Sequence, residues 1–150
     1  MQKFASVDEA LDFAIAKEEE AARFYNDVAA KAKPWMAEIF RGFAAEEAKH
    51  QAKLLGVKRG QKMLDATAKV QDLHLTDYLV ADDNWDGADY QQALILAMKR
   101  EKSAFKLYTD LAASTQVAEL KELFLGLAQE EAKHKVSIEI EYDKVILTDN

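Results

Sequence analysis

Residues 40–50 read FRGFAAEEAKH and residues 124–134 read FLGLAQEEAKH, so the two stretches are identical at eight of eleven positions. A weaker match lies upstream of each copy, between residues 16–25 (AKEEEAARFY) and residues 98–108 (MKREKSAFKLY). The chain is therefore a repeat of two similar halves. We expect the halves to pack about a pseudo-twofold axis.

Each half is predicted to form a hairpin of two antiparallel helices. Ser6 and Glu9 fit a capping box that would start the first helix. Pro34 suits the first turn of the second helix, which glycine at position 56 or 60 would end. The third helix is expected after the turn-like residues 82–87 (DDNWDG), and the fourth is expected to run to about Ile146.

The predicted hairpins cover about residues 6–56 and 87–146, and a crossover of about residues 57–86 joins them. A 23-residue helix is about 35 Å long, so this crossover could return along the bundle, with a short helix around LTDYLVADD (residues 75–83). We therefore predict an all-α fold with a single domain over residues 1–150. It is a four-helix bundle of two antiparallel helical hairpins joined by a long crossover.

The composition excludes several classes of protein. Apolar residues make up 49% of the chain and charged residues 31%, with five glycines and one proline, which is typical of a helical, water-soluble domain. No apolar run could span a membrane, and MQKFASVDEA lacks the apolar core of a secretory signal, so we expect a cytoplasmic protein. The absence of cysteine excludes disulfides and thiolate-bound metal sites. The net charge of -7 argues against nucleic-acid and anionic-membrane partners.

Six side chains of metal-binding type interrupt the apolar stripes of the four predicted helices. The stripe of the second helix is Met36, Phe40, Phe43, Glu47, His50 and Leu54, and that of the fourth is Leu120, Phe124, Leu127, Glu131, His134 and Ile138. Glu18 in the first helix lies between Ile15 and Ala22 on such a stripe. The third helix has the stripe Leu94, Ala97, Met98, Glu101, Phe105, Tyr108 and Ala112.

The charge of these groups favours two metal ions. Four carboxylates in one interior would repel one another, and an isolated buried charge costs several kcal/mol. Two divalent cations would balance four carboxylates, and two neutral imidazoles would complete the ligand set. A single Glu-x-x-His pair is common on helix surfaces. Equivalent core positions in both halves favour the metal interpretation over solvated or protonated side chains.

Four further glutamates fall off the stripes: Glu19 and Glu20 are predicted to face solvent, and Glu46 and Glu130 are the weaker ligand candidates of the two Glu-Glu pairs. Tyr25 and Tyr108 lie two turns after Glu18 and Glu101. These tyrosines could pack as core aromatics, donate hydrogen bonds to ligand carboxylates, or take part in redox chemistry. We favour the hydrogen bonds.

Three other residues have no predicted role in the site. His74 lies in the crossover without a partner of this kind and is expected to be structural or solvated. Trp35 and Trp85 flank predicted helix boundaries and are interpreted as packing residues.

The arrangement of Glu, Glu-x-x-His, Glu and Glu-x-x-His resembles the ferritin-like di-iron carboxylate proteins. The near-symmetric halves and the tyrosines after the single glutamates are most similar to the rubrerythrins. The resemblance covers about residues 6–146 and implies a ferritin-like bundle with two iron ions. It implies that Glu47 and Glu131 bridge the irons, that Glu18 and Glu101 are terminal ligands on opposite irons, and that His50 and His134 each cap one iron.

The chain departs from the rubrerythrin pattern in two respects. Rubrerythrins carry a rubredoxin domain whose iron is held by four cysteines, and this chain has no cysteine. The resemblance therefore implies an external electron donor, such as a rubredoxin or a reductase. Rubrerythrins also tend to carry a further glutamate on the third helix. Met98, Ala104 and Phe105 occupy the predicted inward positions near Glu101, which argues against full rubrerythrin-type peroxidase efficiency.

The function that the resemblance implies is a non-haem di-iron oxidoreductase that reduces hydrogen peroxide or oxygen, as in protection from oxidative stress. The alternative is ferroxidation with iron storage or transfer, as in ferritins. A third hypothesis is a structural module with a vestigial or zinc-filled site. Zinc or mixed manganese and iron also suit these ligands. We expect a homodimer or a higher homo-oligomer.

Overall fold

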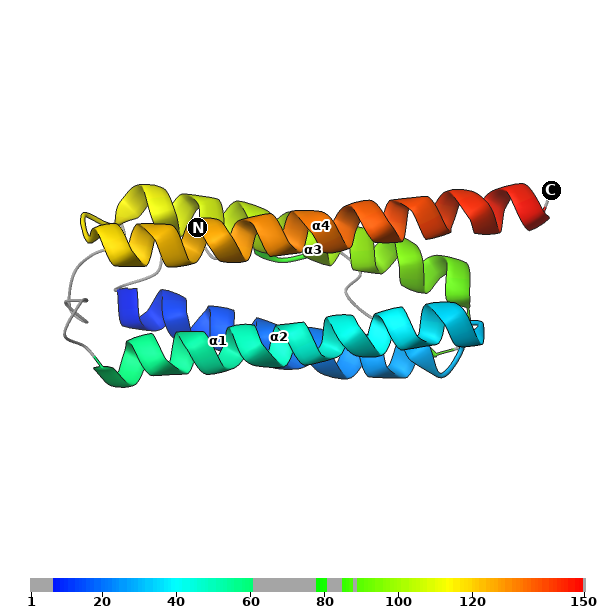
Figure 1. The fold of residues 1–150 in the computed structure, drawn as a ribbon, viewed down its shortest axis with the longest axis horizontal. Coiled ribbons are helices and arrows are strands. Elements are labelled where there is room, and N and C mark those ends of the chain that lie inside the picture. The colour runs from blue at the N-terminus through cyan, green and yellow to red at the C-terminus, as the bar shows by residue number, and fades with distance from the viewer. Residues whose placement is uncertain (1–6, 61–77, 81–84, 88, 150) are drawn as a thin grey trace.

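The computed structural model describes residues 7–60, 78–80, 85–87 and 89–149, and these ranges contain four long α-helices and no strand. The helices are α1 (Val7–Ala29), α2 (Pro34–Gly60), α3 (Tyr90–Ser114) and α4 (Ala118–Asp149). Helix α1 packs against α2, and α3 packs against α4, so that two hairpins face each other (Figure 1). The predicted all-α bundle of two hairpins is confirmed.

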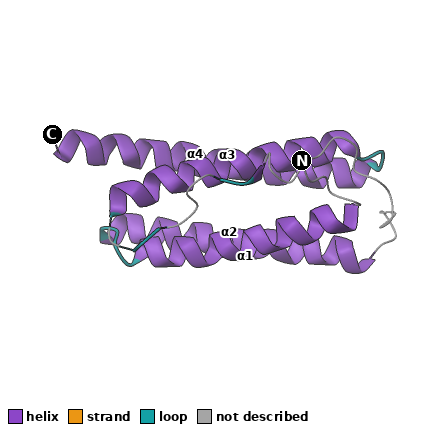
Figure 2. Ribbon diagram, turned by 180° about the vertical axis from the view of Figure 1, so that it is seen from behind, coloured by secondary structure: helices purple, strands orange, loops and turns teal. Residues whose placement is uncertain are grey.

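The connections differ greatly in length. Residues 30–33 join α1 to α2, and residues 115–117 join α3 to α4. By contrast, the end of α2 and the beginning of α3 lie at opposite ends of the bundle, as the two opposed views show (Figures 1 and 2). The chain between the hairpins must therefore cover the length of the bundle, which is the topology of a bundle with one long crossover.

The helix boundaries agree closely with the local signals. Pro34 begins α2, as predicted, and the side chain of Asp89 caps α3 by accepting hydrogen bonds from two backbone N–H groups of its first turn. Helix α2 continues through Gly56, which has open space around it, and ends at Gly60, the second of the two predicted glycines. Helix α4 continues beyond Ile146 to Asp149. Ser6, the predicted cap of the first helix, lies outside the described residues.

The described part of the crossover is attached to α3. Tyr78 is buried, and its hydroxyl donates to the carboxylate of Asp110 at 2.8 Å, while Ser103 Oγ donates to the Tyr78 carbonyl at 2.6 Å. The Trp85 indole donates to the carbonyl of Asp89 at 2.8 Å. Only residues 78–80 of the predicted short helix are described; the rest of it lies outside the described residues.

Two apolar clusters fill the two ends of the bundle. One contains Ala10, Leu11, Ala14, Leu54, Tyr78, Leu107, Tyr108, Leu111, Ala112, Leu120, Phe124, Leu127 and Ala128. The other contains Phe24, Tyr25, Val28, Ala29, Met36, Ala37, Phe40, Phe43, Ala44, Ala93, Leu94, Leu96, Ala97 and Ile138. The middle of every helix, between the two clusters, is left for polar side chains.

One stripe residue of the third helix is wrongly predicted. Phe105 is 42% exposed, whereas Leu107 and Leu111 are buried. The buried face of α3 is therefore turned away from Phe105, which lies at the edge of the predicted stripe. Among the described residues, no helix combines the length and apolarity needed to cross a membrane.

Candidate metal centre

The six predicted ligands meet in one layer in the middle of the bundle. Helices α1 and α3 each supply one carboxylate, and α2 and α4 each supply a Glu-x-x-His pair whose two members lie one turn apart on the inner face. Each is buried, with at most 3% of its surface exposed; the six are Glu18, Glu47, His50, Glu101, Glu131 and His134.

These side chains form two overlapping groups. One group is Glu18, Glu47, His50 and Glu131, and the other is Glu47, Glu101, Glu131 and His134. Within each group, one ligand-type atom from every residue lies within 4.8 Å of the others. Glu47 and Glu131 belong to both groups, so the geometry has two four-residue cages that share two carboxylates.

The inner atoms of the six residues are not satisfied by hydrogen bonds. Nδ1 of His50 lies 2.8 Å from Glu131 Oε1 and 3.3 Å from Glu47 Oε1, and Nδ1 of His134 lies 3.5 Å from Glu47 Oε1. Seven buried atoms nevertheless lack a hydrogen-bond partner among the described residues: Glu18 Oε2, Glu47 Oε1, His50 Nδ1, Glu101 Oε2, both carboxylate oxygens of Glu131, and His134 Nδ1. A buried polar atom without a partner costs about 1–3 kcal/mol. All seven belong to the six predicted ligands.

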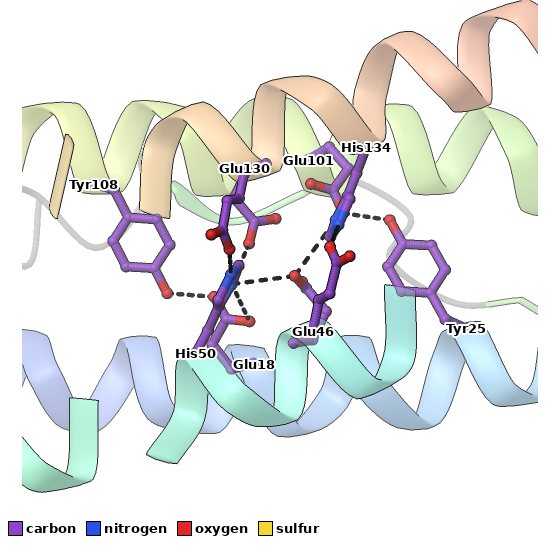
Figure 3. Close-up of polar contacts among 10 residues, drawn as sticks. Glu18, Tyr25, Glu46, His50, Glu101, Tyr108, Glu130 and His134 are labelled. Carbon is purple, nitrogen blue, oxygen red and sulfur yellow. Dashed lines mark hydrogen bonds and ion pairs between the residues drawn. The ribbon is translucent and has the colours of Figure 1, made fainter. Parts of the chain in front are cut away.

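The two predicted tyrosines each donate a hydrogen bond across the bundle. Tyr25 on α1 donates to Glu101 Oε1 on α3, and Tyr108 on α3 donates to Glu18 Oε1 on α1 (Figure 3). In each case the other oxygen of the carboxylate, Oε2, is one of the unpartnered atoms. Each phenol therefore holds one oxygen of a ligand carboxylate and leaves the second free.

Two glutamates that sequence reasoning set aside also belong to the site. Glu130 Oε2 on α4 contacts His50 Nε2 on α2, and Glu46 Oε2 on α2 contacts His134 Nε2 on α4 (Figure 3). The sequence contains a signal for both, because each Glu-x-x-His pair is preceded directly by a second glutamate in both halves. Neither glutamate belongs to the two groups of ligand-type atoms, as expected of the weaker candidates, but each reaches a histidine of the opposite hairpin.

A model of the rubrerythrin family matches residues 9–84 and 92–149, which is most of the chain. The chain belongs to the rubrerythrin family. No curated protein and no solved structure matches it significantly. The matched residues include all six of the residues that form the two groups.

Burial and mutual repulsion make the two shared carboxylates of this rubrerythrin-family site, Glu47 and Glu131, hard to ionise. Burial raises the pKa of Glu47 to about 8, although the nearby His50 opposes the shift. Burial and the charges of Glu101 and Glu47 raise the pKa of Glu131 well above its ordinary value. Cations between the carboxylates would offset both the cost of burial and the mutual repulsion.

The imidazoles respond in the opposite sense. Burial lowers the pKa of His50, but contacts with Glu18 and Glu47 outweigh this and raise it to about 11. Burial likewise lowers the pKa of His134, and Glu101 and neighbouring carboxylates raise it to about 9. Without metal, the protein therefore binds protons where metal ions would otherwise supply positive charge.

A small cavity reaches the ligands from the side of α1 and α3. Its volume is about 50 Å³, and the ligand residues Glu18, Glu47, Glu101 and Glu131 are among those that line it. Lys17 and Arg100 line it as well. Ala104 also lines this cavity.

The remaining predicted residues lie away from this layer. Glu19 is exposed, and Glu20 is partly exposed and pairs with Lys17 at 3.2 Å. The Trp85 ring packs edge-on against Phe24 at 5.8 Å, in agreement with a packing role, whereas Trp35 is half exposed. His74 lies outside the described residues.

Proposed function

We propose that this protein is a non-haem di-iron oxidoreductase that reduces hydrogen peroxide or oxygen with electrons from an external donor. The observation that carries the proposal is the set of seven unpartnered buried atoms, all on six residues that form two cages with two shared carboxylates. Two divalent ions would give each of these atoms a partner and balance the four carboxylate charges.

The two cages support a separate role for each proposed ligand. Glu18 and His50 would hold one iron, and Glu101 and His134 would hold the other. Glu47 and Glu131 would bridge the pair, because only they belong to both cages. Carboxylate and imidazole donors suit iron, and they also accept zinc and manganese, so availability decides which metal is bound.

When bound, two ferrous ions can supply the two electrons that reduction of one peroxide molecule requires. The residues around them have separate tasks. The cavity of about 50 Å³ beside Glu18 and Glu101 would admit an oxidant the size of water or peroxide. The apolar clusters at both ends of the layer exclude bulk water from the ligands.

The tyrosines hold protons beside the reacting layer. Burial, together with the charge of Glu101, raises the pKa of Tyr25 well above its ordinary value, and burial with Glu18 does the same for Tyr108. Both phenols therefore remain protonated near neutral pH and stay hydrogen-bond donors to the terminal carboxylates. This arrangement would keep each terminal carboxylate in one orientation while its free oxygen contacts metal.

A stopped-flow experiment tests the proposal. The wild-type protein is loaded anaerobically with two ferrous ions per chain and mixed with hydrogen peroxide or with oxygen. The proposal predicts rapid oxidation of both irons by one equivalent of peroxide and re-reduction by an added rubredoxin or reductase. Slow oxidation at the rate of free ferrous iron would contradict an enzymatic role.

Light scattering separates the proposal from the ferritin-like alternative. Iron storage requires a large closed shell of subunits, whereas peroxide reduction requires only the centre in each chain. We expect a homodimer or small homo-oligomer with no iron beyond the two-metal site. A shell that accumulates many irons per chain would favour storage.

A further inference from the structure

Each imidazole of the site contacts a glutamate from the opposite hairpin through its outer nitrogen. His50 Nε2 meets Glu130, and His134 Nε2 meets Glu46 (Figure 3). The two histidine side chains are 1% and 3% exposed, whereas Glu130 is 41% and Glu46 49% exposed. The glutamates therefore extend from the surface inward to rings that are otherwise enclosed.

The inner nitrogen of each ring faces the shared carboxylates. His50 Nδ1 lies within 3.6 Å of oxygens from Glu18, Glu47 and Glu131, and it has no hydrogen-bond partner among the described residues. A neutral imidazole carries one N–H and one lone pair. An ionised carboxylate at Nε2 accepts the N–H, and the lone pair is thereby placed on Nδ1, toward the metal.

Glu46 and Glu130 are partly exposed, which lets their carboxylates keep some hydration while they accept the imidazole N–H. Part of each glutamate remains in contact with water in a groove of about 510 Å³ between α2 and α4. Lys49, Lys53 and Lys133 line the same groove. A fully buried carboxylate at the same place would lose its hydration at a large cost in free energy. The partly exposed glutamates avoid most of this cost.

The contacts also cross the repeat. Glu46 is adjacent in sequence to the shared ligand Glu47, yet it contacts the histidine of α4. Glu130 is adjacent to the shared ligand Glu131, yet it contacts the histidine of α2. A change in one hairpin should therefore disturb the metal whose imidazole belongs to the other hairpin.

We propose that Glu46 and Glu130 are positioning residues, each of which fixes the opposite hairpin's imidazole with Nδ1 directed at its metal. Glu46 thereby controls the site of His134 and Glu101, and Glu130 controls the site of His50 and Glu18. The proposal rests on the proposed two-metal function and identifies which residue governs which ion.

Zinc titration of the full chain tests this assignment, with Glu46→Ala, Glu130→Ala, Glu46→Gln and Glu130→Gln as variants. Loss of an outer partner typically weakens metal binding about ten- to a hundredfold. Each alanine variant should therefore weaken one of two zinc sites by that factor and leave the other unchanged. The glutamine variants should retain most of the affinity, because the amide oxygen still accepts the N–H. The exposed Glu38 of α2 and Glu122 of α4 provide matched controls, Glu38→Ala and Glu122→Ala.

Nitrogen-15 NMR of the zinc-loaded, histidine-labelled protein identifies the affected ring. Glu46→Ala should shift the Nε2–H signal of His134 and leave that of His50 in place, and Glu130→Ala should do the reverse. A change at the histidine of the same helix, or variants that behave like the controls, would overturn the positioning roles. Wild-type protein that fails to bind two zinc ions would instead overturn the two-metal function itself.

Discussion

The side of the ligand layer formed by α1 and α3 differs from the side formed by α2 and α4. On the first side, buried phenols of Tyr25 and Tyr108 donate to carboxylate ligands. On the second side, half-exposed carboxylates of Glu46 and Glu130 contact imidazole ligands. The first side opens to a cavity of about 50 Å³ and the second to a groove of about 510 Å³.

On each side, the residue that contacts the ligand has the hydrogen-bonding character that this ligand needs. A carboxylate needs a donor, and a neutral phenol can be buried beside it without adding charge. An imidazole needs an acceptor, and a carboxylate is a strong one whose charge is best kept near water. Both kinds of contact cross from one hairpin to the other, so each half of the repeat orients ligands of its partner half.

The largest expected effect comes from the residues that both sides share. Glu47→Ala or Glu131→Ala should abolish binding of a metal pair, because each removes a ligand from both cages. Glu18→Ala, which affects only one cage, should leave one ion bound. Metal analysis after dialysis measures this, and an alanine variant at position 47 that still retains two ions would refute the bridging assignment.

A second prediction concerns how metal affinity depends on pH, through the imidazoles of the α2 and α4 side. The pKa values of His50 and His134 in the metal-free protein are raised to about 11 and about 9, so both rings are protonated between pH 6 and 8. Metal must displace a proton from each ring, and also protons from Glu47 and Glu131, whose pKa values are raised in the metal-free protein. Lowering the pH by one unit should therefore weaken each site at least about tenfold. Zinc titrations at several pH values, with proton release followed in weak buffer, measure this dependence. Affinity that is unchanged from pH 8 to pH 6 would contradict it.

A smaller effect is expected on the phenol side. Tyr25→Phe removes the donor from Glu101, and a hydrogen bond to a charged group contributes about 1.5–3 kcal/mol. We expect weaker zinc binding at the site of Glu101 and His134 only, with Tyr108→Phe affecting the other site. Tyr142→Phe is the matched control, because Tyr142 packs against the apolar cluster. Equal weakening of both sites by Tyr25→Phe would show that the phenols do not act on separate carboxylates.

The smallest effect is expected for glutamates outside both sides. Glu19→Ala should change the free energy of unfolding by no more than about 0.5 kcal/mol, as is usual for surface positions. The variant should bind two ions with wild-type affinity. Chemical denaturation and metal analysis measure these quantities, and loss of metal would show that the register of α1 is wrong.

Most of the fold could be predicted because periodicity and repetition are local properties of the sequence. The steps of four and three residues in the second and fourth helices placed six buried residues correctly in each helix. The roles of Glu46 and Glu130 could not be predicted this way, because a helix's own stripe does not show what the opposite helix presents. The predicted burial of Phe105 was wrong for a related reason, because the helices that pack against α3 determine which edge of its apolar stripe is covered.

Metal analysis of protein purified from iron-replete cells tests the central claim most directly. We expect two iron ions per chain, or two ions in total where zinc or manganese replaces iron. A chain that contains no stoichiometric metal, and that takes up none when ferrous iron is supplied anaerobically, would contradict it.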